Sequence, residues 1–374
     1  MHGICLFLIN GLGMGNSTRC YAIMEHLAAR GVELHVLTSG NGLAFFGDKP
    51  EVRSVTPMEA LFYSSAGGQI SGLRTLGHVG RLYRLARTKR RQLEELLRRL
   101  QPDLAVTDSE YATAPLRRRG IPIIGLNNAE VIVSEYLRDR AVPPSVRGQF
   151  WLVEFPDYLF HKATCELVLS PSPRPLPPRH PAFKRIGMII RRALHETVRD
   201  LPRGPFPAPR ELRRVVFMLS GSVYASVIPF DRTPVPYHID VVGRPGADGP
   251  NVRFHGRLMN NLTLLREADA LVVNGGFSAV SEALALNKPT FVIPVRGHAE
   301  QFINARAVAN LGRGYVADER TILDDLNRLH ALNRWEGLAP QAPTTGFDGA
   351  REAADIICEH LAARTVRAGQ SGAT

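Results

Sequence analysis

A turn in the second half of the sequence has the residues needed to bind a phosphate group. Gly275, Gly276, Phe277 and Ser278 stand between a short apolar run and a helical pattern. The unpaired backbone N–H groups at the start of such a helix, together with the positive end of its dipole, favour phosphate oxygens, and the hydroxyl of Ser278 adds a donor. We therefore expect a phosphorylated ligand at this turn.

Polar groups that could read a sugar follow the same turn. Glu282 lies four residues after Ser278, on a similar face of the expected helix, where its carboxylate can accept hydrogen bonds from ribose hydroxyls. Glu300 and Gln301 open the next expected helix, and their acidic and amide groups suit sugar hydroxyls. A second donor-rich phosphate loop consists of Ser220, Gly221 and Ser222.

The glycine-rich loop near the start of the chain does not fit a dinucleotide cofactor. Gly11, Gly13 and Gly15 have the spacing G-x-G-x-G instead of G-x-G-x-x-G. The acidic residue that would hold a ribose is missing from the end of the second apolar run, where Leu37-Thr38-Ser39 stands. These features argue against a nicotinamide or flavin enzyme. The glycines either let the backbone approach a bulky ligand or simply close a tight strand–helix turn.

Alternating apolar runs and helical patterns predict a parallel α/β sheet in each half of the chain, with the loops above at the carboxyl ends of the strands. The expected connection between the halves is the proline-rich segment 171–181. In the first half the expected strands are 4–9, 32–37, 104–107 and 121–126, and the expected helices are 20–27 and 81–100. In the second half the expected strands are 215–219, 238–242, 252–254, 270–273 and 290–293, and the expected helices are 262–267, 277–286, 300–311 and 349–363.

Length, cysteine content and charge restrict the class of protein further. The 374 residues suffice for two domains, and the cysteines are scattered, so we expect no zinc site, no disulfide framework and a cytoplasmic location. The net charge of +11 does not indicate a nucleic-acid partner, because only Tyr83 is interleaved with the basic residues of 81–99. This basic helix is either a solvated surface or a contact to an anionic membrane. The early apolar run 4–9 is far shorter than the roughly 20 residues that span a bilayer.

Together these motifs resemble the nucleotide-sugar glycosyltransferases of the GT-B fold, and among them the MurG-like group. The likeness is most specific over 274–305, NGGFSAVSEALALNKPTFVIPVRGHAEQFINA, and it includes the opening segment GLGMGNSTRCYAIMEHLAARGVELHVLT. Shorter matching segments are PDLAVTDSE at 102–110, GIPIIGLNN at 120–128 and FKRIGMIIR at 183–191.

The resemblance implies an α/β architecture of two Rossmann-like domains that face each other across a cleft. An acceptor-binding domain is expected over 1–184 and a donor-binding domain over 185–347. The last segment, 348–374, is expected to form a helix that returns to the first domain and a frayed tail.

The resemblance also assigns roles to single residues. Glu282 would bind the ribose, Glu300 and Gln301 would read the transferred sugar, and His298 would touch the sugar or phosphate or else lie on a loop surface. The donor diphosphate would be held by Gly275, Gly276, Phe277 and Ser278 with Ser220, Gly221 and Ser222, and the base by the backbone near Arg257 and Leu258. The acceptor would be bound by Gly13, Met14, Gly15, Asn127 and Asn128, in a pocket shaped by 58–78. No metal or other cofactor is expected, because helix ends neutralise the leaving diphosphate.

One position departs from the family pattern. Many relatives have a histidine after the third glycine of the opening loop, and this histidine takes the proton of the acceptor hydroxyl. Here the position is occupied by Asn16, which cannot take a proton near neutral pH. Asp108 is the predicted base, directly or through water, while Asn16 positions the acceptor. Glu110 is an alternative base, and Asp108 could instead only cap the next turn.

The predicted function is that of an inverting, metal-independent glycosyltransferase. It would move a sugar from a nucleotide donor, expected to be a UDP-sugar, to a hydroxyl of a small natural product such as an antibiotic, nucleoside or polyketide. Three alternatives stay open: a lipid-linked or glycolipid acceptor at a membrane surface, a UDP-N-acetylglucosamine 2-epimerase-like enzyme, and a non-catalytic protein that binds sugar nucleotides. The protein is expected to be a monomer or a homodimer.

Overall fold

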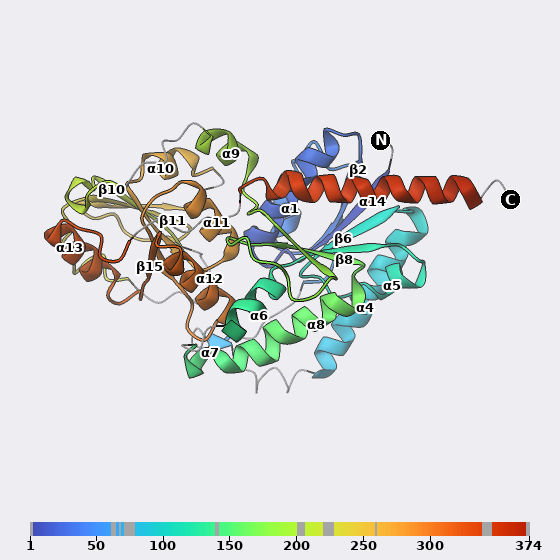
Figure 1. The fold of residues 1–374 in the computed structure, drawn as a ribbon, viewed down its shortest axis with the longest axis horizontal. Coiled ribbons are helices and arrows are strands. Elements are labelled where there is room, and N and C mark those ends of the chain that lie inside the picture. Colours follow the sequence, from blue (N-terminus) through green and yellow to red (C-terminus); the bar gives the residue numbers. More distant parts are fainter. Residues whose placement is uncertain are drawn as a thin grey trace.

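The chain folds into two α/β domains, each built on a parallel sheet with helices on both faces (Figure 1). The computed structural model describes residues 3–60, 65–66, 69–70, 79–138, 142–199, 206–219, 228–258, 260–338 and 346–371. The expected phosphate loop at 220–222 and most of the expected pocket segment 58–78 lie outside these residues.

The first domain holds a seven-stranded sheet in the order β3-β2-β1-β6-β7-β8-β9, with every neighbouring pair parallel. Buried aliphatic residues fill its central strands, as parallel sheets covered on both faces require. Its strands are β1 (Ile4–Ile9), β2 (Glu33–Thr38), β3 (Ser54–Pro57), β6 (Leu104–Asp108), β7 (Ile123–Leu126), β8 (Leu167–Pro171) and β9 (Phe183–Ile186). A separate short hairpin pairs β4 (Ser65–Ala66) with β5 (Gln69–Ile70).

Two helical layers cover this sheet. One face is packed by α1 (Met14–Ala28), α2 (Asn41–Phe46) and α14 (Gly349–Ser371). On the other face lie α4 (Val79–Arg99), α5 (Ala114–Arg118), α6 (Ala129–Arg138), α7 (Pro144–Gln149), a π-helix (Phe150–Glu154) and α8 (Phe155–Thr164). The elements from 129 to 164 were not predicted, and they include the π-helix, a rare element that often marks a functional site.

The second domain holds a six-stranded parallel sheet in the order β12-β11-β10-β13-β14-β15. Its strands are β10 (Arg214–Met218), β11 (His238–Val242), β12 (Val252–Gly256), β13 (Ala270–Asn274), β14 (Thr290–Ile293) and β15 (Gly314–Val316). Its helices are α9 (Arg192–Val198), α10 (Leu262–Glu267), α11 (Phe277–Ala285), α12 (Ala299–Asn310) and α13 (Ile322–Leu332), with a 3-10 turn at Pro209–Glu211.

The proline-rich segment does not connect the domains, contrary to expectation. Residues 171–181 run from the end of β8 to β9, and β9 pairs with β8 in the first sheet. Proline suits this place because an irregular connection at the sheet edge needs few backbone N–H donors. The expected domain boundary at residue 184 accordingly falls inside β9, and the first sheet extends to Ile186.

The chain crosses between the domains twice, and the two crossings lie side by side. Met188 donates its N–H to Gly346 O at 2.9 Å, and Gly349 donates to Met188 O at 3.2 Å. A Cβ on Gly349 would lie 1.9 Å from Gly187 O, so only glycine permits this approach. These hydrogen bonds join the two crossings and place the start of α14 beside them.

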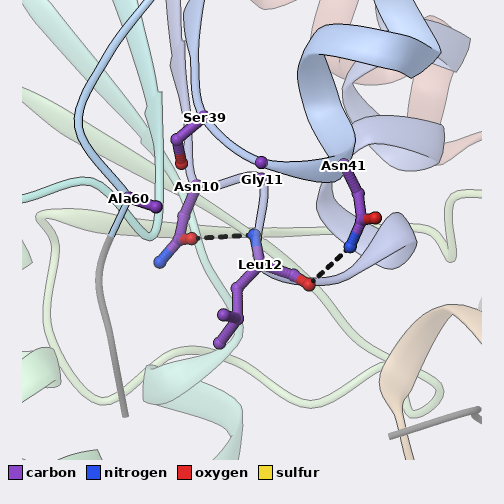
Figure 2. Close-up of a pocket in the computed structure, with 7 residues that line it drawn as sticks. Asn10, Gly11, Leu12, Ser39, Asn41 and Ala60 are labelled. Atoms are coloured by element: carbon purple, nitrogen blue, oxygen red, sulfur yellow. Dashed lines mark hydrogen bonds between the residues drawn. The ribbon is translucent and has the colours of Figure 1, made fainter.

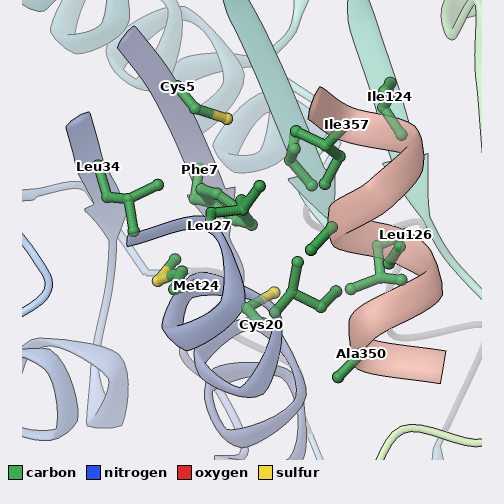
Figure 3. Close-up of a cluster of buried hydrophobic side chains, with 14 of the residues drawn as sticks. Cys5, Phe7, Cys20, Met24, Leu27, Leu34, Ile124, Leu126, Ala350 and Ile357 are labelled. Atoms are coloured by element: carbon green, nitrogen blue, oxygen red, sulfur yellow. The ribbon is translucent and has the colours of Figure 1, made fainter. Parts of the chain in front are cut away.

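The final helix returns to the first domain, as predicted (Figures 1 and 3). Its apolar face packs on β1 and α1, where Ile357 is fully buried in the cluster that contains Phe7, Cys20 and Leu27. Helix α14 therefore closes one face of the first domain after the chain has completed the second. No helix in the described part of the chain is long and apolar enough to cross a membrane.

We expect Ile357→Ala to lower the free energy of unfolding by about 2–5 kcal/mol, because it leaves a cavity between α14 and the sheet. Ile357→Val, which removes one methyl group, is the graded control and should cost about 0.5–1.5 kcal/mol. Urea unfolding followed by circular dichroism measures both. Equal stability of the alanine variant and the wild type would show that α14 is not part of the folded core.

Candidate active site

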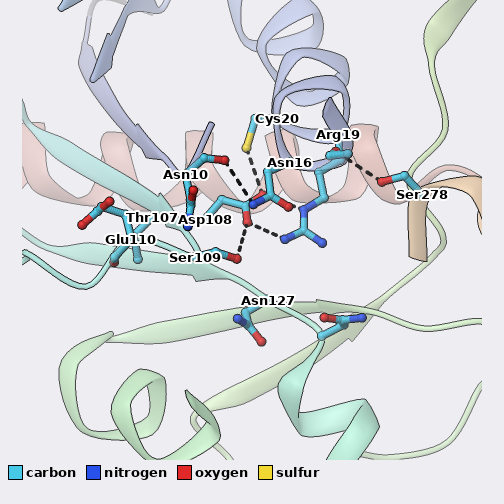
Figure 4. A network of polar contacts seen from close by, with 12 residues as sticks. Asn10, Asn16, Arg19, Cys20, Thr107, Asp108, Ser109, Glu110, Asn127 and Ser278 are labelled. Atoms are coloured by element: carbon cyan, nitrogen blue, oxygen red, sulfur yellow. Dashed lines mark hydrogen bonds and ion pairs between the residues drawn. The ribbon is translucent and has the colours of Figure 1, made fainter. Parts of the chain in front are cut away.

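Loops from the carboxyl ends of both sheets meet between the domains. Ser278, at the start of α11, donates its hydroxyl to Gly15 O in the first turn of α1 at 3.2 Å (Figure 4). Arg257, after β12, donates to Asn41 Oδ1 at 3.2 Å, and Asn128, after β7, donates to Glu300 Oε1 at 3.1 Å. The structure thus brings together residues from the predicted donor and acceptor sides.

The two glycines before α11 have different surroundings. A Cβ on Gly275 would lie 2.5 Å from Gln301 O, and Asn304 donates to Gly275 O at 2.9 Å, so this glycine lets α12 pack closely. A Cβ on Gly276 would have no atom within 4 Å, and no side chain caps α11 at this residue. The start of α11 thus offers free space and uncapped backbone donors, as a phosphate site requires.

Glu282, the predicted ribose ligand, is held by an arginine. Arg191 contacts both of its oxygens, at 2.6 and 2.9 Å, and also donates to Asn261 at 2.9 Å. Arg191 belongs to the crossing between the domains, and no sequence pattern indicated its role. A ribose would therefore meet a carboxylate that is already fixed in orientation, and the ribose role of Glu282 stays a prediction.

The N-terminus of α12 is capped by side chains of the other domain. His298 precedes the helix but provides no side-chain cap. Instead Gln149 accepts the N–H of Ala299 at 2.8 Å, and Glu154 in the π-helix accepts the backbone N–H of Glu300. Gln149 also donates to Glu154 Oε1 at 2.7 Å. The first domain thereby satisfies donors that a helix start normally leaves unpaired.

Two carboxylates and an imidazole are concentrated at this helix start. Oxygens of Glu154 and Glu300 and a ring nitrogen of His298 lie within 4.8 Å of one another. Burial and then the charge of Glu300 raise the pKa of Glu154 to about 8. Burial lowers the pKa of His298 despite the charge of Glu300, and its Nδ1 is buried without a hydrogen-bond partner. Near neutral pH the imidazole is uncharged, so it does not neutralise the carboxylates.

Asp108, the predicted base, lies at the end of β6 in a buried ion pair (Figure 4). It is 0% exposed, and the guanidinium of Arg19 binds both carboxylate oxygens, one of them at 2.5 Å. Cys20 and Ser109 contact the same carboxylate at 3.3 and 3.2 Å. Both oxygens of this carboxylate are occupied by the guanidinium, and burial shields them from an acceptor molecule. The base role stays a prediction, while the geometry favours a positioning role.

In a positioning role, Asp108 would hold the opening loop between β1 and α1. Asp108 O accepts the N–H of Asn10 at 3.0 Å, and Asn10 O accepts from Asn16 Nδ2 at 3.3 Å. Arg19 fixes the next turn of α1 to the same strand end. The ion pair therefore holds both sides of the loop that would meet the acceptor.

Glu110 does not have the surroundings of a base. It is 1% exposed, it pairs with Lys89 at 2.6 Å, and it accepts the N–H groups of Tyr111 and Ala112. These contacts tie α4 to the loop after β6. Lys89 is buried, so it does not belong to the solvated basic surface expected for 81–99.

A cavity of about 180 Å³ adjoins the opening loop (Figure 2). It is lined by Asn10, Gly11, Leu12, Ser39, Gly40, Asn41 and Ala60. Gly11 is required here, since a Cβ would lie 1.6 Å from Ser39 O. Of the predicted acceptor residues, Asn128 contacts Glu300, whereas Asn127 donates to Asp157 at 2.8 Å. Gly13 and Met14 begin α1 close to the cavity, and Leu258 is partly exposed beyond Arg257.

Comparison with known proteins gives one consistent result. The family model described as "Glycosyl transferase family 1" matches residues 4–142 and 248–331. A protein of Methanosarcina acetivorans described as an uncharacterized glycosyltransferase is 23% identical over 373 residues, which cover 89% of this chain and 91% of the relative.

Solved structures share the fold at low sequence identity. The glycotransferase of kitacinnamycin has a TM-score of 0.60 and 21% identity, and the match covers 96% of this chain and 99% of that chain. Acinetobacter baumannii MurG has a TM-score of 0.58 and 15% identity, and the match again covers 96% and 99%.

The Arg19–Asp108 pair can be tested by stability and kinetics together. We expect Asp108→Asn to lower the free energy of unfolding by about 3–5 kcal/mol, because Arg19 is left buried without a counter-charge. The double variant Arg19→Met with Asp108→Leu should recover most of the loss. Thermal unfolding measures this. A stable Asp108→Asn variant that keeps nucleotide binding but loses turnover at least a hundredfold would instead establish Asp108 as the base.

Proposed function

Because this chain belongs to glycosyl transferase family 1, we propose that it transfers a sugar from a nucleotide donor, a UDP-sugar, to a hydroxyl group of a small natural-product acceptor. The fold is GT-B, as predicted. The contact between Ser278 and Gly15 supports the proposal, because the turn that we expect to bind phosphate in one domain lies against the opening loop of the other. A donor at α11 would present its sugar to an acceptor at α1.

The proposed reaction is a single displacement. The oxygen of the acceptor hydroxyl forms a bond to the anomeric carbon and releases its proton to water, while the bond from this carbon to the diphosphate breaks, so the configuration inverts. The electron pair of the broken bond leaves with the nucleoside diphosphate. The N–H groups at the start of α11 and the Ser278 hydroxyl would stabilise that charge without a metal ion.

The remaining residues would orient the two substrates. Glu282, fixed by Arg191, would accept the ribose hydroxyls, and the backbone near Arg257 would hold the base. Gln301 uses its side-chain oxygen to accept the N–H of Val295 at 3.0 Å, which orients its amide nitrogen for a sugar hydroxyl. The cavity of about 180 Å³ beside the opening loop is large enough for one ring of an acceptor.

A lipid-linked acceptor is the second candidate, and one observation favours it. Trp151 and Leu152 in the π-helix are 51% and 70% exposed, and Leu159 in α8 is 45% exposed. Helix α4, on the same side of the sheet, exposes the basic residues Arg84, Arg87, Arg90, Arg91, Arg98 and Arg99. Apolar anchors together with basic side chains suit an anionic membrane surface.

The lipid candidate predicts that the protein sediments with phosphatidylserine vesicles and less with phosphatidylcholine vesicles. Leu152→Ser should weaken sedimentation while leaving the melting temperature nearly unchanged, because this side chain is 70% exposed. Wild-type protein that stays in the supernatant with both vesicle types would eliminate this candidate.

Donor binding can be tested with a substitution that keeps the free protein stable but removes its affinity for nucleotides. UDP-, TDP- and GDP-sugars are compared by thermal shift, and we expect one nucleotide series to stabilise the protein by several degrees, since ligand at 100 times Kd adds about 2.7 kcal/mol. Gly276→Asp should keep or slightly raise the melting temperature of the free protein, because aspartate is a good N-cap and the site has room. In the same variant the nucleotide should no longer raise the melting temperature, because the new carboxylate occupies the phosphate position and repels the phosphate.

Gly276→Asn is the matched control, since it caps the helix without charge and should retain part of the shift. An unchanged nucleotide shift in Gly276→Asp would place the diphosphate elsewhere. Nucleotide binding without transfer to any acceptor would support the non-catalytic alternative, and donor turnover without an acceptor would support the epimerase-like one.

A further inference from the structure

The charges at the start of α12 are poorly balanced in the free protein. Glu154 is 7% exposed, and its hydrogen bonds come from the neutral side chain of Gln149 and the backbone of Glu300. Glu300 receives a bond from the neutral amide of Asn128. Asp157 adds a negative charge that acts on Glu154, but its own carboxylate is paired with His161 at 3.1 Å.

The cations nearby in the described part of the chain do not neutralise Glu154 and Glu300. Arg19 is close enough for the charge of Glu300 to affect its pKa, but its guanidinium is already paired with both oxygens of Asp108. His298 is uncharged near neutral pH because burial lowers its pKa. Buried carboxylates without a counter-ion are unfavourable unless a proton or a cation is supplied.

We infer that Glu154, His298 and Glu300, called the acidic cluster below, bind an ammonium group on the transferred sugar, so that the donor is a nucleotide amino sugar. This inference rests on the proposed function. It adds a charged substituent to the sugar and a residue of the acceptor domain, Glu154, to the donor site.

The geometry suits an ammonium group. The three ligand atoms lie within 4.8 Å of one another, so one nitrogen between them can reach each at about 2.8 Å, the usual length of an ammonium–carboxylate hydrogen bond. An ammonium group has three donors and can serve two carboxylates and one imidazole nitrogen at once. His298 is uncharged near neutral pH, so one of its ring nitrogens can accept such a bond, whereas a neutral sugar hydroxyl supplies one donor and no charge.

The place of the acidic cluster suits the sugar. His298 and Glu300 follow β14 in the domain whose α11 would bind the diphosphate, and Glu154 faces them from the other domain. A sugar held there would touch both domains. Its ammonium group would replace the proton that Glu154 retains in the free protein.

The experiment measures binding of matched UDP-sugars by isothermal titration calorimetry. UDP-sugars with a free amine at C2, C3 or C4 are each compared with the hydroxyl sugar and with the N-acetylated sugar. We expect one free-amine sugar to bind at least tenfold more tightly than both of its uncharged counterparts. Its binding should release about one proton at pH 7, seen as a dependence of the heat on the ionisation enthalpy of the buffer.

The affinity for the amino sugar should change with pH in a defined direction. The ionised form of Glu154 binds the ammonium, and its pKa in the free protein is raised to about 8. Affinity for the amino sugar should therefore rise from pH 6 to pH 8, until the amine itself loses its proton. Affinity for UDP alone should not follow this trend.

Glu154→Gln removes one carboxylate of the acidic cluster while preserving the fold, because the amide oxygen can still accept the N–H of Glu300. It should abolish the preference for the amine and the proton release, while UDP affinity stays within twofold of wild type. Glu196→Gln, at an exposed carboxylate on α9, is the matched control and should change neither.

Three outcomes would overturn the inference. Equal or tighter binding of the uncharged sugars to the wild type would show that the acidic cluster does not select an amine, while UDP binding would still support the proposed function. Binding of Mn²⁺ or Zn²⁺ alone that Glu154→Gln removes would assign the acidic cluster to a divalent cation. Failure of every nucleotide to bind would overturn the proposed function together with this inference.

Discussion

The start of α12 fixes the position of the two domains relative to each other, because its first backbone donors are capped by side chains of the other domain. Gln149 and Glu154 supply these caps, and both belong to the segment around the π-helix. A helix end needs such partners wherever it is buried, so the contact fixes how closely the domains approach. The consequence is electrostatic, because capping by Glu154 brings a second carboxylate next to Glu300.

The same constraint organises the rest of the site. Ser278 contacts Gly15, Arg257 contacts Asn41 and Glu300 contacts Asn128 along the same interface, so three segments of the second domain contact three segments of the first. On the acceptor side the Arg19–Asp108 pair fixes the opening loop, and at the crossing Arg191 fixes Glu282. Polar residues that the sequence assigned to substrates are therefore already oriented by neighbours in the free protein. Such preorganisation reduces the conformational entropy that these side chains lose when a substrate binds.

The sequence was sufficient for the fold, because the order of strands and helices depends on local patterns. Short apolar runs located β1, β6, β10, β13 and β14, and the specific segment 274–305 indicated the family. The partners of the predicted residues could not be found in this way. Arg19 reaches Asp108 across 89 positions and Arg191 reaches Glu282 across 91, and such pairing follows from tertiary packing alone. Glu154 left only a weak signal, a single acidic residue within the apolar stretch FWLVEF.

The central claim is that a sugar passes from a nucleotide bound at α11 to an acceptor bound at α1. Mass spectrometry of small aglycones incubated with the protein and its preferred nucleotide sugar tests this most directly. The account predicts an acceptor that gains the mass of one sugar residue, with one nucleoside diphosphate released per transfer and an inverted anomeric centre in the product by NMR. A donor that binds but stays intact with every acceptor, or a product that retains the donor's configuration, would contradict it.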